Sequence, residues 1–136
     1  MRLVVGTNVI LSGLIGSKSS PGRIMTLWLE RHSEWVTCAQ QIEEITRVLA
    51  EPYFANRVED SFGSAYAFMR MFHLKAIHLV VMPPFKAICR DPNDDYLMAL
   101  LLQHPVDFLI TGDKDLLSLK SAYPKILTPR ELIDRL

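Results

Sequence analysis

The sequence predicts an α/β fold in which helices cover both faces of a central parallel sheet, giving three layers. Short apolar runs alternate along the chain with segments of helical pattern, which is typical of this class. Runs such as Leu3–Val5 lack the polar alternation of half-exposed strands, so both faces of the sheet should be buried. The length of 136 residues, with 49% hydrophobic and 22% charged residues, predicts a single domain over residues 1–136.

Five short runs are expected to form the strands. They end at turn residues, as at Gly6 after the first run and Pro83–Pro84 after the third. The expected strands are residues 3–5, 34–38, 77–81, 107–111 and 126–127. The connections between parallel neighbours should be right-handed crossovers.

Helical segments fill the intervals between these strands. Ser20–Pro21 predicts a helix start with Ser20 as the cap and Pro21 at the first helical position. Pro52 should end another helix, and Thr128–Glu131 forms a capping box that opens the last one. The expected helices are a short one within residues 7–16, then 20–31, 40–50, 60–75 and 93–103, and one that begins near residue 129.

Several classes of protein are excluded by composition. Cys38 and Cys89 are far apart and form no CxxC pair, so they should be buried, reduced thiols. The four histidines are scattered, and a zinc site is not expected. The chain opens without a signal-peptide pattern, and its longest apolar run, Leu97–Leu102, is too short to cross a bilayer. We therefore expect a soluble cytoplasmic protein with no membrane partner.

Net charge also limits how the chain could bind nucleic acid. Lysine and arginine balance aspartate and glutamate at 15 each, so no global field attracts a polyanion. Binding would require a local patch or bound cations.

Acidic and polar residues gather where the carboxyl ends of the predicted strands should lie, which is where ligands bind in open parallel sheets. They come from four separate parts of the sequence: Gly6, Thr7 and Asn8; Glu43 and Glu44; Asp91, Asp94 and Asp95; Thr111, Gly112 and Asp113. Carboxylates placed together repel one another. A hard divalent cation such as Mg²⁺ or Mn²⁺ relieves that repulsion and binds phosphate oxygens.

Each acid also has a purely structural interpretation. Asp94 and Asp95 fall at a helix N-terminus, where acids offset the helix dipole. Asp113 could cap the next helix, and Glu43 and Glu44 could face solvent. Considered together, the acids favour a metal–phosphate site over these three unrelated structural roles.

Four motifs in order resemble the PIN-domain family, and most of all its branch of toxins from toxin–antitoxin systems (VapC-like ribonucleases). They are Val5–Val9 (VGTNV), Glu44–Leu49 (EITRVL), Cys89–Asp95 (CRDPNDD) and Ile110–Leu116 (ITGDKDL). The closing Ile126–Pro129 (ILTP) also fits that branch. The resemblance covers nearly the whole chain. It implies a doubly wound α/β/α sandwich that cleaves RNA with Mg²⁺ or Mn²⁺.

The resemblance also implies which residues carry the activity. The family's helix glutamate matches Glu44, with Glu43 as the weaker match, and its two later aspartates match Asp95 and Asp113. These three acids are the expected catalytic residues and metal ligands. Asn8 and Thr111 match polar residues that would contact substrate near the metal, and Asp91, Asp94 and Asp115 are secondary acids.

The first acid of the family pattern is missing. PIN domains usually read Asp-Thr-Asn after the first strand, and this chain reads Gly6-Thr7-Asn8. Glycine supplies no side-chain oxygen, so we expect the chain to be inactive or impaired. The chain is either a naturally degenerate member or an inactivated variant of an active toxin; the presence of the three other acids favours the second.

Alternatives from other classes stay open at this point. A non-catalytic PIN domain that binds RNA or a protein partner would suit the missing acid, and a purely structural partner-binding domain is a further alternative. A phosphatase with an aspartyl nucleophile would need Asp-x-Asp where Gly6-Thr7-Asn8 stands, and a receiver domain would need an aspartate where Val81 leads into Met82-Pro83-Pro84. Neither pattern is present, and neither is a Gly-rich phosphate loop.

The resemblance further implies an antitoxin partner, and we also expect a homodimer. Large apolar residues that could serve either the core or such a surface are Trp28, Trp35, Phe62, Tyr66, Met69, Met71 and Phe72. Most should be core, although aromatic residues and Met are enriched at the centres of interfaces.

Overall fold

The structure, a computed structural model, describes residues 1–82 and 87–136, with the side chains of residues 59–62 also left aside. Five parallel strands form one sheet in the order β3-β2-β1-β4-β5. The strands are β1 (Arg2–Val5), β2 (Glu34–Thr37), β3 (Ile77–His78), β4 (Phe108–Ile110) and β5 (Ile126–Leu127). The predicted three-layer α/β fold with a parallel sheet is confirmed.

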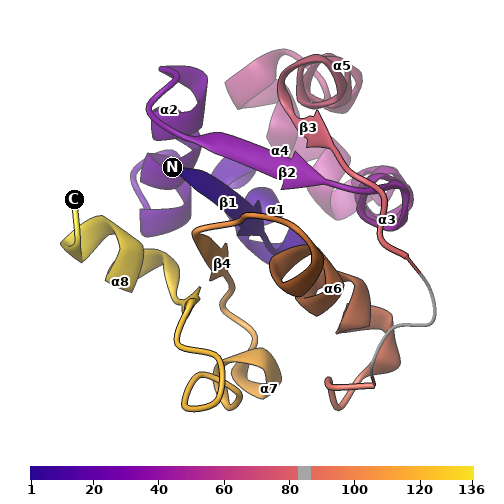
Figure 1. The fold of residues 1–136 in the computed structure, drawn as a ribbon. Coiled ribbons are helices and arrows are strands. Elements are labelled where there is room, and N and C mark those ends of the chain that lie inside the picture. The colour runs from indigo at the N-terminus through magenta and orange to yellow at the C-terminus, as the bar shows by residue number, and fades with distance from the viewer. Residues whose placement is uncertain (83–86) are drawn as a thin grey trace.

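Helices lie on both sides of this sheet, as Figure 1 shows. In chain order they are α1 (Thr7–Ile15), α2 (Ser20–Leu29), α3 (Ala39–Leu49), α4 (Pro52–Phe62), α5 (Ala65–Lys75), the 3-10 turn η1 (Pro92–Asp94), α6 (Asp95–Gln103), α7 (Lys114–Leu117) and α8 (Pro129–Asp134). One buried cluster packs the five helices α1 through α5, together with α8, against one face of the sheet. The other joins α6 and α7 to the opposite face.

The strands are apolar throughout because their alternate residues enter different cores. In β1, Leu3 and Val5 belong to the first cluster and Val4 to the second, and all three are at most 2% exposed. Burial on both faces explains why the sequence shows unbroken apolar runs.

The register of the central strands brings their carboxyl ends to one edge. β1 pairs with β2 on one side and with β4 on the other, so that Val5 lies beside Ile110. The backbone N–H of Gly6 donates to the Ile110 carbonyl at 2.8 Å. Gly6 and the Thr111–Asp113 turn therefore leave the sheet side by side, as the strand pattern predicted.

A stacked tryptophan pair closes the first core at the opposite end of β2. The rings of Trp28 and Trp35 lie 4.3 Å apart and nearly parallel, with Phe72 packed against both. All three are at most 2% exposed. They belong to the core, whereas Tyr66 on α5 is 76% exposed.

The helical predictions were wrong in one region. Instead of one helix over residues 60–75, α4 and α5 are separate helices that meet at Gly63, where φ is +84°. A left-handed residue cannot continue an α-helix and suits glycine. Pro52 begins α4 rather than only ending α3, since proline is well tolerated in the first turn of a helix.

Smaller differences concern element ends. Ser19, not Ser20, caps α2, and its side chain accepts the N–H of Gly22. β3 spans two residues rather than five, and the predicted stop at Pro83–Pro84 lies outside the described residues. The capping box at Thr128 and Glu131 is present as predicted.

The structure also bears on two predictions from composition, the state of the cysteines and the lack of a membrane-spanning helix. Both cysteines are free, with Cys38 buried and Cys89 half-buried. Within residues 1–82 and 87–136, no helix is both long and apolar enough to cross a membrane.

Candidate functional site

The carboxyl edge of the sheet collects the side chains that the sequence singled out. Asn8 follows β1 as an exposed residue of α1, and Thr111 follows β4 as a buried one. Glu44 comes from α3, which begins directly after β2. Asp94 and Asp95 come from the junction of η1 with α6.

Gln41 fixes α3 against the end of β1. It is 1% exposed, accepts the Thr37 hydroxyl at 2.6 Å, and donates its amide N–H to the Val5 carbonyl at 2.6 Å. The carbonyl it binds belongs to the residue just before Gly6. This bridge sets the position of α3, and therefore of Glu44, relative to the end of β1.

Asp95 is the most buried of the candidate acids, at 7% exposed. Its Oδ1 accepts the backbone N–H of Cys89 at 2.8 Å and that of Ile88 at 3.2 Å. The bond from the Cys89 backbone is the main reason that the pKa of Asp95 lies below its ordinary value. Asp95 therefore holds the 88–89 segment in place and stays ionised at neutral pH.

Asp94, its neighbour, has the opposite electrostatic environment. Burial first, and neighbouring carboxylates second, raise the pKa of Asp94 from 3.8 to about 6. The carboxylates that contribute to this rise are, in order of effect, Asp91, Asp113, Glu44 and Asp95. Carboxylates from three separate parts of the fold thus repel one another at this edge.

Tyr96 joins two of these elements through its hydroxyl group. The ring is 5% exposed, and the hydroxyl lies 3.5 Å from Glu44 Oε2 as donor and 3.4 Å from Thr7 Oγ1. Burial, and then the charge of Glu44, raise the pKa of Tyr96 well above its usual range. Tyr96 is neutral and turns Glu44 toward α6.

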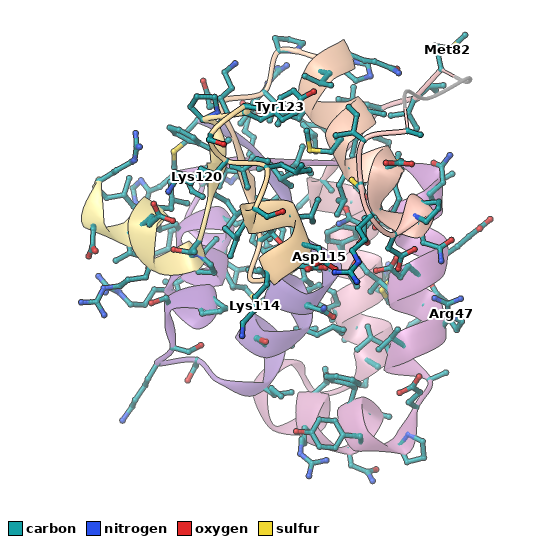
Figure 2. All side chains as sticks on the ribbon, turned by 90° about the horizontal axis from the view of Figure 1, so that it is seen from below. Arg47, Met82, Lys114, Asp115, Lys120 and Tyr123 are labelled. Carbon is teal, nitrogen blue, oxygen red and sulfur yellow. The ribbon has the colours of Figure 1, made fainter. Side chains whose placement is uncertain are left out.

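Asp113 and the secondary acids also take part in local structure. Asp113 caps α7 by accepting the Asp115 N–H at 2.8 Å, and its own N–H donates to Thr111 Oγ1. Asp115 lies 3.7 Å from an Arg90 guanidinium nitrogen, and both side chains are exposed. Figure 2 shows Asp115 on the side of α7 toward α6. The capping role predicted for Asp113 is therefore present alongside its place in the acidic group.

The beginning of α6 also constrains Cys89. Burial, with the neighbouring Asp95 carboxylate, raises the pKa of the Cys89 thiol to about 12. A thiol with this pKa is protonated at neutral pH and is a poor nucleophile.

Gly6 adopts a backbone conformation that any residue can take, with φ −60° and ψ 146°. A Cβ built there would lie 3.3 Å from the Ile110 carbonyl oxygen and 3.6 Å from Thr111 Oγ1. A side chain at this position would point toward the β4 end and needs only a small local shift. Glycine is not required here by backbone geometry.

A groove runs beside these acids between α3 and the start of α6, with a volume of about 510 Å³. Gln40, Glu43, Glu44 and Arg47 form the α3 wall, and Pro92, Asn93 and Tyr96 form the other. Glu43 and Glu44 both line it, but Glu44 is the one that Tyr96 contacts. In residues 1–82 and 87–136, no three His, Cys, Asp or Glu side chains lie close enough together to hold a metal ion as they stand.

Sequence reasoning missed Gln41 and Tyr96. Gln41 shares the inward face of α3 with Ile45 and Leu49, and a polar residue on an apolar helix face indicates a buried hydrogen-bonding role. Tyr96 opens an apolar run, where its hydroxyl group needs a partner when buried.

The strand order, the parallel sheet and the acidic side chains at its carboxyl edge define a three-layer α/β domain whose ligand-binding edge is acidic. The sequence pattern of the PIN domain matches residues 2–115, and this chain belongs to the PIN domain family. PIN domains are generally nucleases that act on RNA and depend on divalent metal ions.

The chain is also similar to the uncharacterized protein MJ1680 of Methanocaldococcus jannaschii. The two are 25% identical over 145 residues, which cover 98% of this chain and 90% of the relative. No solved structure matches the chain significantly.

Proposed function

We propose that residues 1–136 form a single PIN domain that is the metal-dependent endoribonuclease toxin of a toxin–antitoxin system, with activity lost or reduced because Gly6 replaces the first acid. The observation that carries the proposal is the environment of Asp94 at the carboxyl edge of the sheet, where burial and the nearby charges of Asp91, Asp113 and Glu44 raise its pKa. Neighbouring carboxylates of this kind favour a divalent cation.

The carboxylate oxygens at this edge are the ligand type that a hard cation such as Mg²⁺ or Mn²⁺ prefers, and side-chain rotation would have to bring them around one ion, because no three of the described side chains lie close enough as they stand. Glu44, Asp95 and Asp113 are the proposed ligands and catalytic acids. When bound, such a cation would polarise a phosphodiester and lower the pKa of a water molecule. The two backbone N–H bonds on Asp95 Oδ1 orient its carboxylate, as hydrogen bonds around metal ligands commonly do.

The remaining groups would position the RNA. The Thr111 hydroxyl accepts the Asp113 N–H and keeps its own hydrogen for donation to a phosphate oxygen. Asn8 is exposed at the end of β1, where its amide can donate to the same phosphate. Tyr96 holds Glu44 on the α6 side of the groove, and Asp91, Asp94 and Asp115 supply additional negative charge around the cation.

Replacing Gly6 with aspartate tests this assignment. The Gly6→Asp protein should bind Mn²⁺ more tightly in calorimetric titration, cleave single-stranded RNA, and inhibit growth when expressed. A metal ion lowers the activation free energy by several kcal/mol, which corresponds to orders of magnitude in rate. Restoring the missing acid should therefore raise the cleavage rate by a large factor. Asp95→Asn in the Gly6→Asp background should abolish cleavage, and circular dichroism must first show that each variant folds.

One observation favours a second candidate, a non-catalytic PIN domain that binds RNA or a protein. Gly6 provides no oxygen at the position of the family's first acid. A folded Gly6→Asp protein that neither binds Mn²⁺ nor cuts RNA would establish this second function.

We also propose a homodimer and an antitoxin that covers the acidic edge. Large apolar side chains are exposed on α5 and just after β3: Tyr66 at 76%, Leu74 at 74%, Val80 at 71% and Met82 at 65%. Solution mass across a wide concentration range tests the dimer, and a strictly monomeric mass would contradict it.

A further inference from the structure

Arg47 has the geometry of a phosphate-binding residue on the wall of the groove beside the acids. Gln40, Glu43, Glu44 and Arg47 all line that groove. Their spacing of three, four and seven residues places them on one face of α3. Along this face of α3, the glutamates near the acidic edge of the sheet are followed by the positively charged side chain of Arg47.

The guanidinium of Arg47 is exposed and has two glutamates within helical reach. Glu43 and Glu44 stand four and three residues before it, but in the described part of the chain Arg47 makes no ion pair with either. Figure 2 shows Arg47 at the outer side of α3. The Arg47 side chain lines the groove and is exposed to solvent.

The positive charge of Arg47 matters for RNA binding because the chain as a whole offers no excess of positive charge. The chain has no net charge, and the edge that would receive the scissile phosphate is acidic. RNA therefore needs at least one local cation to hold its backbone there. Arginine matches phosphate geometry through paired N–H donors.

The spacing suits a neighbouring nucleotide. Arg47 follows Glu44 by three residues, about 4.5 Å along the helix axis, and its long side chain extends the reach to the next phosphate of a single strand. Gln40 and Asn93 line the groove from opposite walls, and side-chain amides can hydrogen-bond exposed base edges.

We propose that Arg47 binds the RNA phosphate adjacent to the scissile one, so that the groove between α3 and η1 accepts a single-stranded nucleotide next to the cleavage point. This inference rests on the proposed ribonuclease function and adds to it a substrate-positioning residue outside the acidic group.

Binding to the unmodified chain is the first test. Fluorescence anisotropy with a labelled ten-nucleotide single-stranded RNA, in EDTA, should show about tenfold weaker binding for Arg47→Ala. The slope of log K against log salt should fall by about 0.7, as expected for one phosphate contact on a single strand. Arg47→Lys should keep the slope and part of the affinity. Arg130→Ala is the matched control, because Arg130 lies on α8, which packs against α2 and β5 rather than against α3, and it should change neither quantity.

Substrate length provides the second test, in the Gly6→Asp protein. Arg47→Ala should raise KM about tenfold on the ten-nucleotide RNA with little change in kcat. A dinucleoside monophosphate has no adjacent phosphate, so Arg47→Ala should leave its cleavage unchanged. A structural role for Arg47 would instead impair both substrates equally.

The outcomes separate the two proposals. If RNA is bound and cleaved but Arg47→Ala matches the parent on both substrates, the phosphate contact is refuted and the nuclease function stands. If neither the unmodified chain nor the Gly6→Asp protein binds or cleaves RNA, the ribonuclease function fails and the contact fails with it.

Discussion

Asp94→Asn should stabilise the metal-free protein at neutral pH, because it removes a charge that the fold partly buries and places near other carboxylates. The pKa of Asp94 is about 6 in the folded chain against 3.8 ordinarily. At about 1.36 kcal/mol per pH unit this difference of about two pH units corresponds to about 3 kcal/mol. Asp94 is half-buried, so solvent screening reduces the expected gain to about 1–2 kcal/mol.

The pH dependence has a definite sign. Between pH 4 and 6 the folded chain holds a proton on Asp94 that the unfolded chain has released, so the stability of the parent falls as pH rises through this window. The advantage of Asp94→Asn should therefore be absent near pH 4, grow up to about pH 6, and stay constant above it.

Urea unfolding in EDTA at pH 4, 5, 6 and 7.5 measures this difference. Asp134→Asn, at an exposed residue paired with Arg130 on α8, should change stability by no more than about 0.5 kcal/mol at any of these pH values. If Asp94→Asn lowers stability at pH 7.5, or if its effect does not depend on pH, burial and the neighbouring carboxylates do not destabilise the Asp94 charge as argued.

Three further substitutions test the same region by stability at pH 7. Asp95→Asn should destabilise the protein by about 1–2 kcal/mol, because it weakens two hydrogen bonds to a charged acceptor. Since the pKa of Asp95 is lowered in the folded chain, this loss of stability should disappear as pH falls below about 4. A loss that persists in acid would contradict the argument. Gln41→Met should lower the free energy of unfolding by about 2–4 kcal/mol in urea titration, because the Val5 carbonyl and the Thr37 hydroxyl lose their buried partner; a neutral effect would show that water replaces the amide. Without metal, Gly6→Asp should lower the free energy of unfolding by about 1 kcal/mol, because of the close contact with the Ile110 carbonyl and the added negative charge. Mn²⁺ should then raise the melting temperature of this variant. An unchanged melting temperature with Mn²⁺ would argue against a metal at this edge.

The sheet could be predicted from the sequence because its strands are buried on both faces. Unbroken apolar runs such as Leu3–Val5 have few other interpretations in a chain of this size. The α4–α5 region was harder to predict, because Pro52 is compatible with both the end of one helix and the start of the next. The break at Gly63 depends on a positive φ that a single glycine in a helical pattern does not reveal.

The acids of the candidate site could be named from the sequence, but their individual environments could not. Glu44, Asp95 and Asp113 were expected from the family resemblance, and their assignment as ligands stays a prediction. Their individual environments depend on tertiary contacts: Asp95 meets two backbone N–H groups, whereas its neighbour Asp94 meets other acids. No pattern of residues predicts which of two adjacent aspartates will face a loop and which will face a cluster.

The Trp28–Trp35 pair gives the protein a built-in optical reporter that is separate from the acidic edge. These are the two tryptophans of the chain, both buried and stacked at 4.3 Å beside α5, whereas Glu44, Asp94 and Asp113 follow the carboxyl ends of the strands. Stacked indoles give strong near-ultraviolet circular dichroism that collapses when the core melts. Addition of Mn²⁺ should therefore leave this signal almost unchanged, while global unfolding abolishes it, and one cuvette can distinguish metal occupancy from denaturation without any added dye.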